Sequence, residues 1–136
     1  HWHIIGYGAD ERLISDRIAK AGMESRVHLL GKRDNPYPYM AACDLYIQPS
    51  RYEGKSIAVR EAQMLGRPVI ITDYATARSQ VDNGTDGLIV PLDNASCARA
   101  IADALSSPGL LTGLASATAT RDYTLSHEVQ KLYRLL

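Results

Sequence analysis

The chain has 136 residues, of which 46% are hydrophobic and 22% charged, and its 15 acidic side chains balance 15 basic ones. This length suits one domain of ordinary size with its own hydrophobic core, and the composition is typical of a globular protein. The charge balance argues against nucleic acid as the main partner, because such binding generally needs a basic face.

Short apolar runs alternate with helical patterns along the chain. The runs that predict strands are, in order, "WHIIG", "RVHLLG", "DLYIQP", "RPVIITD" and "DGLIVPLD". The stretches that predict the helices between and after them are "DERLISDRIAKAG", "NPYPYMAAC", "SIAVREAQML", "ATARSQVDNG" and "NASCARAIADAL", the last capped by Asn94. This alternation predicts an α/β fold with a Rossmann-like, mostly parallel sheet of about five strands and flanking helices.

We expect residues 1–136 to form a single domain whose C-terminal tail, residues 106–136, is helical. The tail contains the helical patterns "GLLTGLASA" and "SHEVQKLYRLL". The abrupt start at "HWHIIGYG" indicates a fragment of a longer protein. Cys43 and Cys97 have no ligand neighbours at a useful spacing, which favours two reduced thiols in a cytosolic protein over a metal site.

Five loops follow the carboxyl ends of the predicted strands, where ligands of such sheets bind. They are "GYGAD", "GKRDNPYP", "PSRYEGKS", "TDYATA" and "PLDNA". The third loop is the richest, because Glu53, Gly54, Lys55 and Ser56 stand directly before a predicted helix and Glu61 stands within it. We therefore expect the functional site to be built around this loop.

A helix that begins near Gly54 offers unpaired N–H groups and the positive end of its dipole to a ligand. Gly54 allows close approach to the backbone, and Ser56 either caps the helix or donates to an anion. These features predict a phosphate site, beside which the carboxylates of Glu53 and Glu61 suit sugar hydroxyls. A plain surface helix, with Glu61 paired to a nearby arginine, explains the same residues almost as well.

The loop resembles the donor-site signature of the retaining glycosyltransferases of family 4, which have the GT-B fold. That signature is a "P-S-x-x-E-G" turn and a pair of glutamates with seven residues between them, here Pro49, Ser50, Glu53, Gly54 and Glu61. Further matches are "IIGYGADERLI", "RVHLLGKRDNPYPYMAACDLYIQPS" and "EAQMLGRPVIITDYATARSQVDNGTDGLIVPLDN". The resemblance covers residues 1 to about 105 and implies the C-terminal, donor-binding half of a GT-B protein.

The resemblance implies a role for each matched position of the third loop and its helix. Glu53 would accept hydroxyls of the transferred sugar, and Glu61 would hold the ribose. The backbone of four residues would hold the diphosphate: Gly54, Lys55, Ser56 and Ile57.

Two earlier loops also have implied roles. Gly6 and Gly8 would let the first loop approach the substrate, and Lys32 and Arg33 would lie along the base. No metal or other cofactor is implied, since helix dipoles and basic side chains replace metal charge in this fold.

The "EGKSIAVREAQ" variety has Lys55 and Ser56 where the family often has Phe-Gly, and resembles enzymes of capsular and surface polysaccharide assembly. It implies transfer of a sugar from a nucleotide sugar, with a UDP-sugar favoured, to a glycan or lipid-linked acceptor with retention of configuration. The implied location is the cytoplasm, with the parent protein peripheral at the inner membrane face. The implied partners are donor, acceptor and an N-terminal domain, without nucleic acid.

The chain also departs from the family at its start. "WHIIG" corresponds to the family's second strand, so the first strand and its "G-R-x-x-x-x-K-G" turn are missing. In the order 3-2-1-4-5-6 that strand is central. We expect either a vacancy beside "WHIIG" or direct pairing of "WHIIG" with "DLYIQ". In both cases the fragment by itself should bind donor poorly and catalyse nothing.

Three other functions stay open. A sugar-nucleotide epimerase of the same fold would bind a similar donor, and a non-catalytic module would bind it without turnover. A dinucleotide-binding Rossmann domain is suggested by "GYG" after a strand, but the third glycine is missing and Asp10 follows at once.

Overall fold

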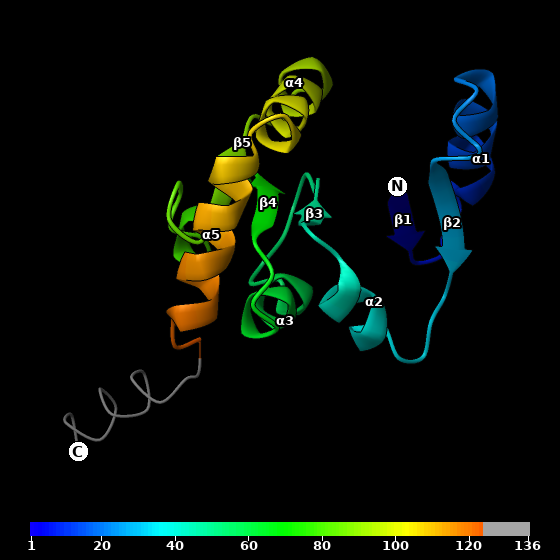
Figure 1. Cartoon of the computed structure of the whole chain (residues 1–136). Helices are drawn as coiled ribbons and strands as arrows, with labels where there is room; N and C mark the ends of the chain where they lie inside the picture. Colours follow the sequence, from blue (N-terminus) through cyan, green and yellow to red (C-terminus); the bar gives the residue numbers. More distant parts are fainter. Residues whose placement is uncertain (124–136) are drawn as a thin grey trace. The chain divides into compact units, whose positions relative to one another are not determined.

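A computed structural model describes residues 1–123 of the chain (Figure 1). The stretch "SHEVQKLYRLL", for which the sequence predicts a helix, lies outside the described residues. Strands and helices alternate, so the predicted α/β class is confirmed. Packing groups the residues into two compact units, His1–Pro38 and a second unit that begins at Tyr39. The single domain expected over residues 1–136 stays a prediction.

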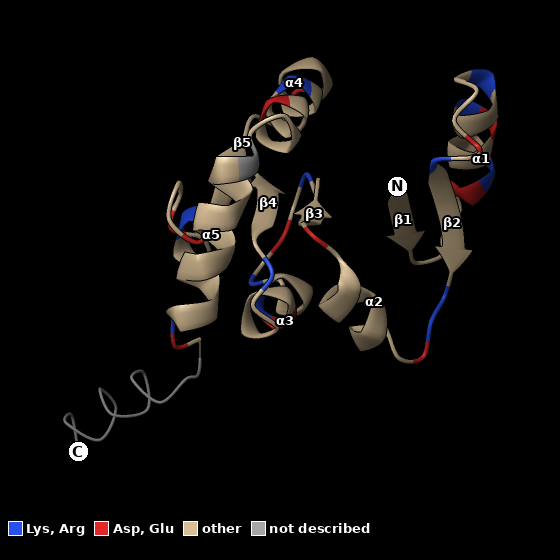
Figure 2. Ribbon diagram, viewed as in Figure 1, with Lys and Arg blue, Asp and Glu red and all other residues tan. Residues whose placement is uncertain are grey.

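The first unit contains two parallel strands and the helix between them. β1 (Trp2–Ile5) pairs with β2 (Val27–Gly31), and α1 (Glu11–Lys20) connects them. The apolar stripe of α1 is only partly covered within this unit, since Ile14 and Ile18 are half-buried and no residue of α1 is fully buried. Figure 2 shows acidic and basic residues mixed along the rest of this helix.

The second unit is built on a three-stranded parallel sheet. β3 (Tyr46–Gln48), β4 (Val69–Thr72) and β5 (Gly87–Val90) follow the order β3-β4-β5, so β4 is central. Every residue of β4 is fully buried, as expected for a β-branched strand that is covered on both faces. The register places Val69 opposite Gly87.

Helices cover both faces of this sheet. On one face, Val69 and Ile71 pack with Val59 and Ala62 of α3 (Ile57–Met64). On the other face, Ile70 packs with Cys97 and Ile101 of α4 (Asn94–Leu105). The remaining elements of the described chain are α2 (Tyr37–Ala42), η1 (Ala77–Ser79) and α5 (Pro108–Thr120).

Gly87 shows why one position of the sheet requires glycine. A Cβ atom at this position would lie 2.6 Å from Cγ2 of Val69 and 2.6 Å from the Val69 carbonyl oxygen. Real Cβ atoms do not approach other atoms so closely, so any side chain here would push β5 away from β4. The glycine in "DGLIVPLD" therefore allows the two strands to pair closely.

Within residues 1–123, the first unit contains the sheet β1-β2 and the second unit contains the sheet β3-β4-β5. The choice between a vacancy beside "WHIIG" and direct pairing of "WHIIG" with "DLYIQ" stays a prediction. One local prediction was wrong. The cap of α4 is Asp93, whose Oδ1 accepts the Ser96 N–H at 2.9 Å, and Asn94 is already helical. The short helix predicted within "ATARSQVDNG" is the three-residue 3₁₀ helix η1.

None of the helices within residues 1–123 combines the length and the apolarity that crossing a bilayer would require.

Candidate functional site

The loop between β3 and α3 ends in a helix cap. Ser56 has an extended backbone, with φ −67° and ψ 115°, and its Oγ accepts the Val59 N–H at 3.4 Å. The helix begins at Ile57, one residue into the predicted helix "SIAVREAQML" and three residues after Gly54. The reason is that Ser56 supplies a side-chain acceptor for the first turn, which is the usual function of an N-cap serine.

The backbone carbonyls of this loop are tied to the segment after β4. The Thr76 hydroxyl donates to the Glu53 carbonyl at 3.0 Å and also contacts the Gly54 carbonyl, while Thr72 donates to the Ser50 carbonyl. In a trans peptide the C=O and N–H groups point in opposite directions. The N–H groups of Gly54 and Lys55 therefore point away from Thr76. Neither has an acceptor within residues 1–123.

Gln80 holds the backbone of Ser56 from the same segment. The Ser56 N–H donates to Oε1 of Gln80 at 2.9 Å, and Nε2 of Gln80 donates to the Ser56 carbonyl at 2.9 Å. Tyr74 also donates to Oε1 of Gln80, at 3.1 Å. The Ser56 N–H, which the resemblance assigns to the diphosphate, is thus already engaged. The N–H groups that face no acceptor within the described residues are those of Gly54, Lys55, Ile57 and Ala58.

A side-chain network joins Glu53 to the start of α3. Oε1 of Glu53 accepts from Nε2 of Gln48 at 2.7 Å and from Oγ of Ser50 at 2.8 Å. The same Nε2 donates to Oγ of Ser56 at 2.8 Å, and the Tyr46 hydroxyl donates to Oε1 of Gln48 at 2.8 Å. A carboxylate that can accept sugar hydroxyls and a helix start that can bind an anion therefore lie side by side.

Together with burial, the charges of both signature glutamates, Glu53 and Glu61, raise the pKa of the Tyr46 phenol. Burial, followed by the charges of Glu53 and Glu61, raises the pKa of Tyr46 to about 12. Burial and then Glu53 also raise the pKa of Tyr74. The half-buried Glu61 stands in the second turn of α3. The structure therefore brings both predicted carboxylates to the region where β3 ends and α3 begins.

The other predicted site residues belong to the first unit. Gly6 has a φ of 146°, a backbone conformation that favours glycine, and its N–H donates to the Gly31 carbonyl at 3.0 Å. Nζ of Lys32 lies 5.7 Å from the ring centre of Tyr7, so the loops after β1 and β2 meet. A Cβ atom at Gly8 would meet open space, and Arg33 contacts the Lys32 carbonyl at 3.5 Å.

Sequence reasoning missed three polar residues of the second unit: Gln48, Thr76 and Gln80. In β3, Gln48 follows an aromatic and an apolar residue, and this polar residue at the end of a strand was the available signal for a functional position. Thr76 lies in "TDYATA", a loop that the sequence marks as functional without indicating which side chain matters. Gln80 gave no signal, because its partner Ser56 is 24 residues away in the chain.

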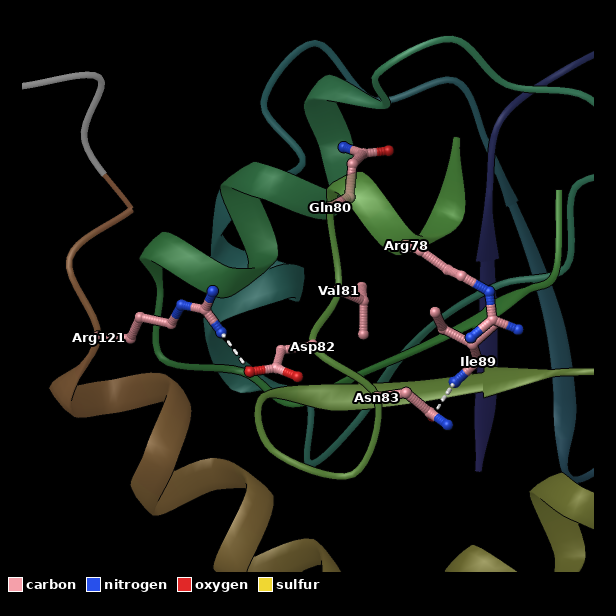
Figure 3. Close-up of a pocket in the computed structure, with 7 residues that line it drawn as sticks. All are labelled: Arg78, Gln80, Val81, Asp82, Asn83, Ile89 and Arg121. Atoms are coloured by element: carbon pink, nitrogen blue, oxygen red, sulfur yellow. Dashed lines mark hydrogen bonds and ion pairs between the residues drawn. The ribbon is translucent and has the colours of Figure 1, made fainter. Parts of the chain in front are cut away.

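A separate pocket of about 370 Å³ lies beside β5 (Figure 3). Its arginines are paired with acids: Arg78 lies 3.2 Å from Asp73, and Arg121 lies 3.6 Å from Asp82 and 2.8 Å from Asp86. None of the sequence-predicted site residues lines this pocket. Its lining consists of Arg78, Gln80, Val81, Asp82, Asn83, Ile89 and Arg121.

Comparison with known proteins gives a family and several relatives. Residues 1–107 match the family model described as "Glycosyl transferases group 1". The chain is 34% identical to the lipopolysaccharide core biosynthesis mannosyltransferase LpsB of Rhizobium meliloti over 88 residues, which are 63% of this chain and 25% of that protein. It is 34% identical over 92 residues, 67% of this chain and 25% of the relative, to an N-acetylgalactosaminyltransferase of Campylobacter jejuni that acts on a diphospho-undecaprenol substrate. The chain spans about a quarter of the length of these relatives.

Solved structures resemble the described fold over almost the whole chain. Alr3699/HepE of Anabaena, in complex with UDP, has a TM-score of 0.81 at 23% identity, covering 98% of this chain and 40% of that one. The sucrose-phosphate synthase of Thermosynechococcus elongatus has a TM-score of 0.77 at 27% identity, covering 94% of this chain and 34% of that one. The chain therefore has the fold of one part of these larger proteins.

Proposed function

Because this chain belongs to the glycosyl transferases group 1 family, we propose that it forms the donor-binding part of a retaining glycosyltransferase of family 4, with the GT-B fold that its structural neighbours support. One observation carries the proposal. The loop before α3 places an acceptor carboxylate, Glu53, next to backbone N–H groups that have no acceptor within residues 1–123. Sugar hydroxyls and a diphosphate are the groups that this pair of features would recognise together.

The diphosphate would bind at the start of α3. The N–H groups of Gly54, Lys55 and Ile57 and the Ser56 hydroxyl would donate to its oxygens, and the positive end of the helix dipole and the Lys55 ammonium would favour its charge. As the bond between sugar and phosphate breaks, negative charge grows on the leaving diphosphate. The same donors would then stabilise the transition state more than the ground state.

Glu53 and Glu61 would bind hydroxyls instead of reacting. Two donors already hold one oxygen of Glu53, which suits a fixed acceptor for hydroxyls of the transferred sugar. Glu61 would hold the ribose from the second turn of α3. In the first unit, Gly6 and Gly8 would let the backbone approach the substrate, and Lys32 with Arg33 would lie along the base.

The proposed donor is a UDP-sugar, and the proposed acceptor is a glycan or a lipid-linked sugar of surface or capsular polysaccharide. The names of the relatives support this class, since they include lipopolysaccharide, O-antigen and diphosphoundecaprenol transferases, one of them named for UDP-Gal. HepE in complex with UDP and with UDP-glucose adds support for the uridine donor.

The proposed reaction needs no metal, because the start of α3 and Lys55 would supply the positive charge. Transfer that is unchanged after treatment with a chelator would support this point, and transfer restored by added Mg²⁺ would refute it. The proposed location is the cytoplasm, with peripheral association at the inner membrane face. Acceptor binding would depend on an N-terminal domain, so residues 1–136 by themselves should not transfer sugar.

Calorimetry with the full-length protein tests the donor site. We expect UDP to bind and uridine to bind far more weakly, because uridine lacks the diphosphate. Because the loop that contains Lys32 and Arg33 is proposed to lie along the uracil base, ADP and GDP should bind more weakly than UDP. Equal affinity for UDP and uridine would refute the diphosphate site at α3.

Transfer assays separate the proposal from its two rivals. A transferase moves the sugar to an acceptor and releases UDP, an epimerase changes the sugar while the nucleotide stays attached, and a binding module does neither. Chromatography of UDP-glucose and UDP-N-acetylglucosamine after incubation with and without lipid-linked acceptor distinguishes the three outcomes.

A further inference from the structure

The amide of Gln48 joins two groups that the proposed donor site needs. Gln48 is the last residue of β3 and is half-buried. Its Nε2 donates to Glu53 at 2.7 Å and to Ser56 at 2.8 Å, and its Oε1 accepts from Tyr46 at 2.8 Å. The orientation of the amide is set by chemistry, since an ionised carboxylate can only accept and the nitrogen must face it.

These bonds determine what Glu53 still offers to a ligand. Its Oε1 accepts from both Gln48 and Ser50, at 2.7 and 2.8 Å, while no group within residues 1–123 donates to its Oε2. The carboxylate is thereby held by one oxygen and presents the other as an acceptor. An acceptor of this kind suits a sugar hydroxyl, which can donate.

The same bonds determine what Ser56 offers. Its Oγ accepts from Nε2 of Gln48 at 2.8 Å and from the Val59 N–H at 3.4 Å, which occupies both lone pairs of the hydroxyl oxygen. The hydroxyl can then only donate its hydrogen. A hydroxyl restricted to donating suits a phosphate oxygen, which can only accept.

We propose that Gln48 is a positioning residue that makes the site prefer a sugar nucleotide to the free nucleotide diphosphate. It acts through Glu53 on the sugar and through Ser56 on the diphosphate, and it touches neither. This inference rests on the donor site proposed above. A purely structural role, in which Gln48 fastens the loop to β3, would instead change stability and both affinities together.

The test compares Gln48→Met with the wild-type full-length protein. Met has a similar length but cannot hydrogen-bond to Glu53 or Ser56. The affinities for UDP, UDP-glucose and UDP-N-acetylglucosamine are measured by calorimetry, and the sugar nucleotide that wild type prefers is used for the variants. We expect the preference for that sugar nucleotide over UDP to fall about tenfold, as for the loss of one hydrogen bond to a charged group. Gln48→Asn keeps an amide, but its side chain is one methylene shorter, so it should lose the same preference. This second variant keeps the test valid if Gln48→Met does not fold.

Two further variants complete the experiment. Gln63→Met removes a different glutamine, which is buried and contacts the Gln80 carbonyl and Asp86. This variant should have a lower melting temperature but an unchanged preference for the sugar nucleotide over UDP. When Glu53→Gln is already present, adding Gln48→Met should lower the preference for the sugar nucleotide over UDP by less than about twofold. The reason is that Gln48 acts on the sugar through Glu53, so the effects of the two substitutions are not additive.

The outcomes separate this inference from the proposed function. If wild type binds neither UDP nor the sugar nucleotides, the proposed function fails and this inference fails with it. If wild type prefers the sugar nucleotide and Gln48→Met keeps that preference, or weakens both ligands equally, only the role of Gln48 is refuted. Additive losses in the Glu53→Gln background would likewise overturn the role.

Discussion

Gln80 and Ser56 are joined by two hydrogen bonds of 2.9 Å, one at the N–H and one at the carbonyl of Ser56. Both residues are buried. The side-chain amide of Gln80 thus pairs with the backbone of the helix cap in the way a neighbouring strand would. The direction in which α3 starts therefore depends on a residue that follows β4.

We expect Gln80→Met to destabilise the protein by about 1–3 kcal/mol, because it leaves a buried N–H and a buried carbonyl of Ser56 without these partners. Loosening of the helix start should also weaken UDP binding. Chemical denaturation and calorimetry measure the two effects. The exposed neighbour Ser79 offers a control, since Ser79→Ala should leave both the stability and the UDP affinity nearly unchanged. Unchanged stability in Gln80→Met would show that the two bonds contribute little.

Glu61→Gln should weaken UDP binding by about 1.5–3 kcal/mol, as for the loss of a hydrogen bond to a charged group. The matched ligand is 2′-deoxy-UDP, which lacks one of the ribose hydroxyls that Glu61 is proposed to hold. Calorimetry should show that the substitution costs less with this ligand than with UDP. Equal losses with both ligands would remove the 2′-hydroxyl from the role of Glu61.

Asp86 is fully buried, and its carboxylate receives Arg121 at 2.8 Å, Tyr123 at 3.0 Å and the Asp82 N–H at 2.8 Å. Asp86→Ala should destabilise the protein by about 1–3 kcal/mol, because the buried Tyr123 hydroxyl loses its acceptor. Asp82→Ala is the control. The Asp82 side chain is 60% exposed and lies 3.6 Å from Arg121, so its loss should cost less than about 1 kcal/mol. Similar losses for both variants in urea denaturation would contradict this ranking.

Stability should decline at alkaline pH partly because of Tyr46. Its pKa rises from 10.0 to about 12 on folding, mainly through burial. Below pH 10 both states keep the phenol proton. Between about pH 10 and 12 the unfolded state loses it first, so rising pH favours unfolding. Tyr46→Phe should therefore lose less stability than wild type between about pH 8 and pH 11 in urea denaturation. Part of the alkaline loss of stability should remain in Tyr46→Phe, because the pKa of Tyr123 is also raised to about 12. An unchanged slope in Tyr46→Phe would refute the role of Tyr46.

Much of the fold could be predicted because its signals are local. The run "VIIT" is β-branched throughout, and this pattern alone indicates a strand covered on both faces, which β4 is. Similarly, the third loop was identified because Glu53, Gly54 and Lys55 stand between a strand and a helix. The exact starts of helices were less accessible, since they depend on which polar side chain reaches the first turn. Asp93 rather than Asn94 does so in α4.

The sequence by itself determined the order of the elements and, through its motifs, the glycosyltransferase family. It also indicated the loop in which we propose the donor site. Only the tertiary structure decided how that loop is held. Thr76 bonds to Glu53 across 23 residues of the chain, and Gln80 bonds to Ser56 across 24. Such distant pairs leave no periodic pattern in the sequence. Their bonds turn the carbonyls of Glu53 and Gly54 inward and engage the N–H of Ser56. Which N–H groups remain for a ligand is therefore a property of the packed structure, because it depends on where every competing acceptor lies.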